Sequence, residues 1–111
     1  MAVVSKPLFT SKYAENAQTT QYTAPIGTRT IIDKFTGYNG TAGPLYLLVN
    51  IVASGGAAAA TNLIVGKAIG TLETYTFPEL VGHVLEPGGF VSTLAGAATS
   101  IVIRASGREV S

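Results

Sequence analysis

The sequence predicts an all-β protein, an antiparallel β-sandwich of jelly-roll type with an extended N-terminal arm. Segments rich in β-branched and aromatic residues recur along the chain, and Gly, Pro or Asn separates them every 8 to 12 residues or so, as in sandwiches and jelly rolls. The longest apolar run, residues 44–53, has the two-residue period of a strand. The best helical spacing, PELVGHVL at residues 78–85, is short because Gly82 interrupts it. We divide the chain into an arm at residues 1–18 and one sandwich domain at residues 19–111.

The N-terminal segment has no sustained hydrophobic period, because charged residues and a proline interrupt its few apolar side chains. We therefore predict an extended arm. Leu8, Phe9 and Tyr13 are large groups on this arm, so we name them as candidate contacts to a partner subunit. The alternative is a frayed terminus, which is common at chain ends.

Residues 44–53, PLYLLVNIVA, are predicted to form the central strand. Alternation places Leu47 and Val49 on one face, and Tyr46 and Leu48 on the other. Both faces are largely apolar, so the strand needs a core on one side and a second cover on the other. That cover is either another layer of this chain or a neighbouring molecule.

The other elements follow from turn signals and β-forming residues. A bulge or a change of sheet is expected near Asp33, where the apolar alternation of residues 28–39 shifts. The run of four alanines at residues 57–60 is too short to nucleate a helix and is predicted to be a surface loop. A type II turn is expected at residues 86–89, where Pro is followed by Gly. Strands are predicted at residues 19–24, 28–39, 62–69, 72–77, 90–95 and 99–105, the third and fourth as a hairpin.

The chain is poor in ionic groups. Charged residues make up 12% of it, against about 25% in typical soluble domains, and the mean hydropathy is +0.39. Large apolar patches usually mark contacts, so we expect a homo-oligomer in which neighbours shield much of the surface. The alternative is a neutral surface of Ser, Thr, Gly and Ala that tolerates low charge.

The residues give little sign of catalysis, so we predict that the protein is not an enzyme and has no cofactor. There is no cysteine and one histidine, His83, so we expect neither a disulfide nor a metal site. No serine has the GxSxG setting that a triad with His83 and Asp33 would suggest. The acidic residues are scattered singly. The formal net charge of +1 is not clustered as a nucleic-acid footprint requires. No membrane span or signal peptide is evident, so we expect a soluble, uncleaved chain.

Three segments resemble small structural proteins of tailed bacteriophages: residues 17–35, 72–95 and 100–110. They are patterns of turns and strands, with no catalytic motif to carry over. The resemblance implies a virion component, with a head decoration or cement protein favoured. Such a protein would self-associate, with a trimer favoured, and would bind the major capsid protein or other virion proteins. It would be located in the virion, with the capsid surface favoured, and would be assembled in the host cytoplasm. The alternatives are a tail or tail-fibre component, and a carbohydrate-binding module that uses exposed tyrosines.

Overall fold

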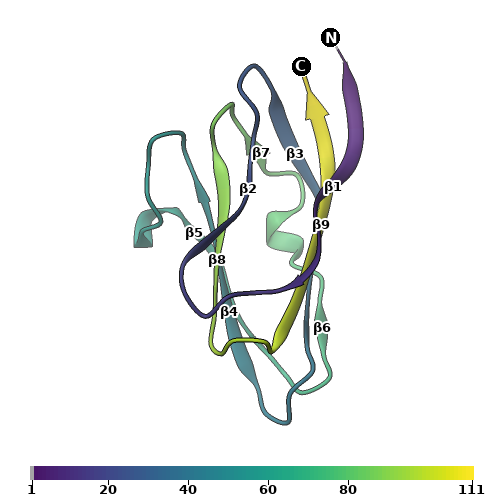
Figure 1. Ribbon diagram of the computed structural model, residues 1–111, viewed down its shortest axis with the longest axis vertical. Coiled ribbons are helices and arrows are strands. Elements are labelled where there is room, and N and C mark those ends of the chain that lie inside the picture. Colours follow the sequence, from purple (N-terminus) through teal and green to yellow (C-terminus); the bar gives the residue numbers. More distant parts are fainter. Residues whose placement is uncertain (1) are drawn as a thin grey trace.

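The computed structural model describes residues 2–111 as two antiparallel β-sheets packed face to face, which confirms the predicted sandwich (Figure 1). The first sheet has the order β1-β9-β3-β6, and β7 also pairs with β3. The second sheet has the order β2-β8-β4-β5. The strands are β1 (Val3–Tyr13), β2 (Thr19–Thr23), β3 (Arg29–Asn39), β4 (Leu45–Val52), β5 (Leu63–Ile69), β6 (Thr74–Tyr75), β7 (Val84–Leu85), β8 (Phe90–Ala95) and β9 (Ile101–Val110).

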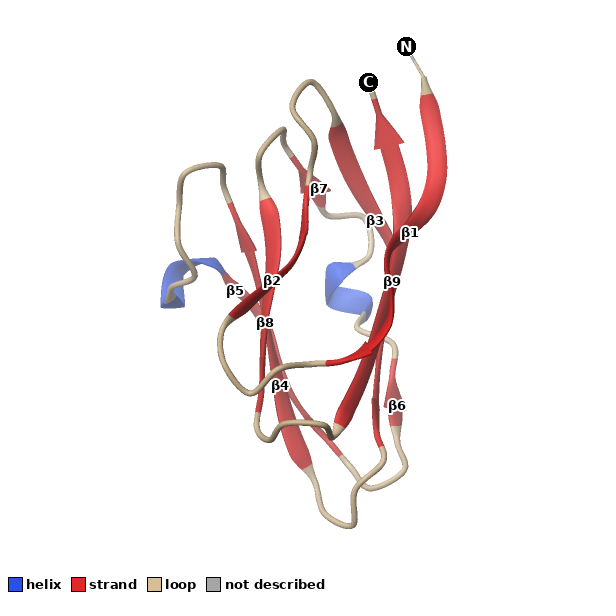
Figure 2. Ribbon diagram, in the orientation of Figure 1, coloured by secondary structure: helices blue, strands red, loops and turns tan. Residues whose placement is uncertain are grey.

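The connections are those of a jelly roll. Successive strands alternate between the two sheets, except that β4 and β5 form a hairpin and β6 and β7 both pair with β3. Two short 3₁₀ turns, η1 (Ala60–Asn62) and η2 (Pro78–Leu80), are the only helical segments among residues 2–111 (Figure 2).

The hydrophobic core lies between the sheets, with Phe35 of β3 fully buried in it. Its ring packs edge-on against Phe9, with centroids 5.8 Å apart, and against Phe77, with centroids 5.1 Å apart. Phe77 and Leu80 are also fully buried, and they belong to the segment around η2 that lies near both β3 and β5. This segment therefore closes one side of the sandwich between the two sheets.

The predicted N-terminal arm is extended, but it is a strand of the sandwich. β1 pairs with β9 from Val3 opposite Val110 to Tyr13 opposite Val102. The register shifts between Pro7 and Phe9 and again before Lys12, and these shifts break the alternation that would have marked a strand. The division into an arm and a domain is thus corrected, because the arm supplies an edge strand of the single domain.

Several finer predictions are confirmed. β2, β4, β5 and β8 lie where strands were expected, and β4 lies inside its sheet between β5 and β8. The register of β3 against β9 shifts between Ile32 and Lys34, which places the expected bulge at Asp33. In the turn before β8, Gly88 has φ +83° and the Gly89 N–H donates to the Glu86 carbonyl at 2.8 Å.

The predicted hairpin of residues 62–69 with 72–77 is wrong. β6 has two residues, and it pairs with β3 in the other sheet. Leu72 and Phe77 both have positive φ, 57° and 44°, and these left-handed residues bracket β6 where the chain crosses between the sheets. β9 also continues beyond Ala105 to Val110, because β1 and β3 flank it on both sides.

Candidate functional site: the two outer faces of the sandwich

Charge is divided unequally between the two sheets. Among the 7 basic and 6 acidic residues of the chain, only Lys67 lies in the strands of the β2-β8-β4-β5 sheet or in the loop at residues 53–62. We call the β2-β8-β4-β5 sheet the neutral sheet. The strands of the other sheet, the charged sheet, carry Lys6, Lys12, Arg29, Asp33, Lys34, Arg104, Arg108 and Glu109.

The outer face of the neutral sheet, here called the neutral face, has Tyr46 and Leu48 of β4 at its centre. Tyr46 lies opposite Ala68, and Leu48 lies between Gly66 and Leu94 on the neighbouring strands. Tyr46 is 43% exposed, Ala68 and Gly66 are exposed, and Leu48 is partly exposed. Gly66 leaves room for the Leu48 side chain, because a Cβ at Gly66 would come within 2.9 Å of Leu48 Cδ2. The result is an uncharged, largely apolar surface.

The chain's own loop covers the rest of β4's outer side. Asn50 is 4% exposed, and its Nδ2 donates to the Ala59 carbonyl at 3.0 Å and to Asn62 Oδ1 at 2.7 Å. Asn62 Nδ2 in turn donates to the Ala57 carbonyl at 2.9 Å. The predicted second cover of the central strand is therefore partly another layer of this chain, while Tyr46 and Leu48 stay outside it.

A hollow of 180 Å³ lies where the loop meets the neutral face. Leu48 and Asn50 line it from β4, and the alanines of the loop line it from residues 58–60. Gln18 also lines it, and Gln18 Nε2 donates to Ser92 Oγ at 2.7 Å. None of the lining residues is charged, so the hollow belongs to the same uncharged surface.

Lys67 is the one base of the neutral sheet, and it lies at the edge of the sandwich. Its Nζ is 4.8 Å from the ring centroid of Tyr75 in the other sheet, a cation–π geometry. The Tyr75 hydroxyl donates to Glu79 Oε2 at 2.7 Å; this bond raises the pKa of Tyr75 and lowers the pKa of Glu79. Lys67 thus pairs with the ring across the edge of the sandwich, and an inward-pointing charge of this kind discourages edge pairing.

The outer face of the charged sheet is built differently. Arg108 of β9 donates from Nε to both carboxylate oxygens of Asp33, at 3.1 and 3.0 Å, and from Nη2 to Oδ1 at 2.9 Å. The bulge of β3 at Asp33 lies beside Arg108. One end of this face has an apolar row instead, in which Tyr13, Val102 and Tyr38 lie side by side on three strands.

A polar network ties the two sheets together at the end of the sandwich that holds the chain termini. Tyr22 of β2 donates to Glu109 and accepts from the Thr30 hydroxyl at 2.7 Å, while Lys6 makes an ion pair with Glu109 at 3.4 Å. Burial, and then the hydrogen bond to Glu109, raise the pKa of Tyr22 to about 12. This group joins β2 of one sheet to β1, β3 and β9 of the other.

The three residues predicted as partner contacts separate in the structure. Leu8 is 8% exposed within the core, and Phe9 packs against that core. Both serve the packing of their own chain, because the β1 bulge turns consecutive side chains inward. Tyr13 is 51% exposed and remains available to a partner. Sequence reasoning missed Ala68 and Gly66 as surface residues, although the absence of charge around them was a usable signal.

No cluster of three or more His, Cys, Asp or Glu side chains occurs within residues 2–111. Asp33, the acid considered for a triad, is held by Arg108. In the same described part of the chain, no helix is long and apolar enough to cross a membrane.

Comparisons with known proteins point to the fold. No protein-family model matches the chain, and no curated protein matches it. A solved structure from Bacillus endospore appendages, described as a novel family of disulfide-linked pili, matches with a TM-score of 0.57. The match covers 99% of this chain and 88% of the other, with 13% sequence identity. At that identity the likeness shows a shared β-sandwich fold.

Proposed function

We propose that this chain is a non-enzymatic structural protein whose copies pack together through the neutral face. The observation that carries the proposal is the division of charge, which leaves one sheet and its covering loop with a single charged residue, Lys67. Interface centres are depleted of charged residues, whereas free surfaces of soluble domains are not. The face around Tyr46, Leu48 and Ala68 has this composition.

The area required fits one face of the molecule. A specific contact of standard size buries roughly 800 Å² on each partner. The isolated chain exposes 5512 Å², so such a contact would take about one-seventh of its surface. A single outer sheet face is large enough, and the charged face remains free to meet solvent or a second partner.

The setting we propose is a bacteriophage virion. The resemblance of residues 17–35, 72–95 and 100–110 to small phage structural proteins favours a head decoration protein that self-associates, as a trimer by preference, and stabilises the shell of major capsid protein. The pilus neighbour supports an assembly role for a sandwich of this shape. The present chain has no cysteine, so its assembly would depend on packing and not on disulfide links.

The absence of cysteine allows a direct test. Ala68→Cys places a single thiol on the neutral face, and Ser5→Cys places one on the exposed outer side of β1 as a matched control. A short bis-maleimide should cross-link copies through position 68 and leave the position 5 variant largely uncoupled. Equal cross-linking of the two variants would contradict the proposal.

A tail or tail-fibre location is the structural alternative. Electron microscopy of virions labelled on this protein separates it from the head. Label on the shell supports decoration, and label confined to the tail overturns it while leaving the assembly role intact.

Carbohydrate binding is a second candidate, favoured by the row of Tyr13, Val102 and Tyr38. Tyr13 is 51% exposed and Tyr38 is 37% exposed, so two aromatic side chains are accessible on one face of the sheet. A glycan array tests this function. Binding that is lost in both Tyr13→Ala and Tyr38→Ala would establish it, and an array without hits would exclude it for the glycans displayed.

A further inference from the structure

Two bases on the charged sheet lack an acidic partner within the described chain. Four of the seven bases are in ion pairs: Lys6 with Glu109, Lys12 with Glu15, Arg29 with Glu86 and Arg108 with Asp33. Lys67 lies over the Tyr75 ring. The remaining two, Lys34 and Arg104, are both exposed and line the same depression.

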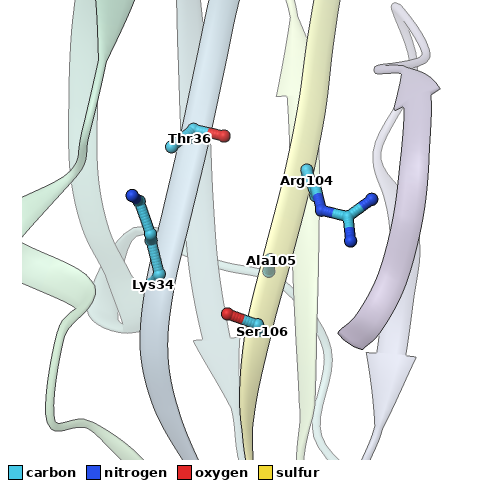
Figure 3. A pocket seen from close by; sticks show the side chains of 5 residues that line it. All are labelled: Lys34, Thr36, Arg104, Ala105 and Ser106. Carbon is cyan, nitrogen blue, oxygen red and sulfur yellow. The ribbon is translucent and has the colours of Figure 1, made fainter. Parts of the chain in front are cut away.

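This depression has a volume of 240 Å³ and lies between β3 and β9 (Figure 3). Thr36 and Ser106 point their hydroxyl groups toward the gap between the two strands, whereas the Lys34 ammonium and the Arg104 guanidinium point to opposite sides. The nearby carboxylate of Asp33 is already engaged by Arg108. The depression therefore has two uncompensated positive charges, one on each side of a pair of hydroxyl donors.

Two acids lack a basic partner in the same way. Glu73 and Glu79 are exposed, stand before and after β6, and make no ion pair within residues 2–111. Glu73 Oε1 accepts from the Gly70 N–H at 2.6 Å, and Glu79 accepts from the Tyr75 hydroxyl. Lys67 acts on Glu79 electrostatically, but it is not within ion-pair distance. We call this segment, residues 73–79, the acidic edge.

We propose that the depression lined by Lys34 and Arg104 receives the acidic edge of a second copy, with Glu73 and Glu79 as its ligands. Two cations that diverge suit two separate carboxylates better than one small anion centred between the hydroxyls. The donor and acceptor surfaces differ, so the contact is heterologous: each copy gives its edge to one neighbour and receives the edge of another.

The contact would orient the copies more than it would hold them together. Exposed ion pairs are individually weak and are screened by salt, whereas complementary charge fixes register and speeds encounter. This inference rests on the proposed function in one respect, namely that the partner is a second copy. It concerns a different surface from the neutral face, so the two can be tested separately.

The test uses two charge-reversed proteins. One carries Lys34→Glu and Arg104→Glu, and the other carries Glu73→Lys and Glu79→Lys. Both also carry Ala68→Glu, which introduces a charge into the neutral face and removes its contribution. Each protein alone should show no edge-to-depression contact, because like charges then face each other. A mixture should restore the contact in both directions, since each depression then meets an edge of opposite charge.

Binding is read as chemical-shift changes in one isotope-labelled partner at low ionic strength. We expect the mixture to bind at least about tenfold more tightly than either protein binds itself, with the difference lost as salt is raised. The control is Lys12→Glu with Arg29→Glu, which changes net charge equally at paired sites. Its depression stays positive, so it should produce no shifts at the reversed edge, residues 73–79, of the labelled Glu73→Lys and Glu79→Lys protein, whereas the Lys34 and Arg104 variant should. A mixture that binds no better than its components overturns the inference. The inference is also overturned if inorganic phosphate produces shifts around the depression and the second protein does not. If cross-linking at position 68 fails while the mixture binds, the neutral-face proposal alone is lost.

Discussion

Asn50, in the middle of β4, donates a hydrogen bond from Nδ2 to Oδ1 of Asn62, 2.7 Å away, and this bond fixes the 53–62 loop on the outer side of the sheet. Asn62 also accepts from the Ala59 N–H at 2.9 Å and donates to the Ala57 carbonyl. One side chain thereby positions the connection at residues 53–62, whose regular structure is limited to the 3₁₀ turn η1. The loop decides how much of the central strand remains open to a partner.

Replacing Asn62 by Ala should therefore loosen the loop and lower stability. The change removes three hydrogen bonds and leaves the buried Asn50 amide incompletely paired, which costs about 1–3 kcal/mol. Denaturant unfolding gives the free energy, and hydrogen exchange should show faster exchange at residues 57–62. Asn16→Ala, at an exposed turn position, is the control and should remain within about 0.5 kcal/mol of wild type. Equal stability of the two variants would mean that the loop is not held as described.

Gly107→Ala should be among the most damaging small substitutions. A Cβ at this position would press against the carbonyl oxygen of Ile31 on the neighbouring strand, which is rigid backbone and cannot move aside. Because β9 pairs with β3 along most of its length, we expect a loss of about 3 kcal/mol, the upper part of the overpacking range. Gly43→Ala has open space around the new methyl group and should be nearly neutral in the same thermal or denaturant unfolding experiment. A folded, fully stable Gly107→Ala protein would show that the β3–β9 spacing is wrong.

Alkaline pH should weaken the junction between the sheets at Tyr22. Its pKa is raised from the ordinary 10.0 to about 12, so the folded chain holds the phenol proton more tightly than the unfolded chain. The corresponding stability is fully present below pH 10 and is lost as the pH rises from 10 through 12. Unfolding free energies across this range should therefore fall less steeply for Tyr22→Phe than for wild type. Tyr46→Phe, at an exposed site, is the control and should follow the wild-type curve. If the unfolding free energy of Tyr22→Phe falls with pH in parallel with that of wild type, ionisation of Tyr22 does not contribute to the loss of stability at alkaline pH.

The sequence is sufficient to predict most of the neutral sheet and insufficient for the edges of the charged one. β4 and β8 are recognisable because each is a run of mostly apolar or β-forming residues between turn signals, as suits a strand flanked by other strands on both sides. β1 was expected to be a free arm because its bulges place Leu8 and Phe9 on the same side, which hides the period. Only the pairing with β9 reveals it as a strand, and no local pattern carries that information.

Composition alone also does not locate the candidate surfaces, because their positions depend on how the strands pair. The low charge of the chain predicts contact surfaces, but it does not show that the charge lies on one sheet. That division depends on which strands pair, since β5 with its single Lys67 joins β4, whereas β9 with Arg104 and Arg108 joins β3. Of the expected partner contacts of the arm, Leu8 and Phe9 are side chains that the fold uses for its own core, whereas Tyr13 is exposed.

The central claim is that copies associate through the neutral face. Sedimentation velocity across a range of concentrations tests it most directly, with wild type compared to Ala68→Glu and to Ser5→Glu, which adds the same charge to the outer side of β1. We predict that wild type and Ser5→Glu form a defined oligomer as concentration rises, while Ala68→Glu stays monomeric. Wild type that remains monomeric throughout, or Ala68→Glu that assembles like wild type, would contradict the claim.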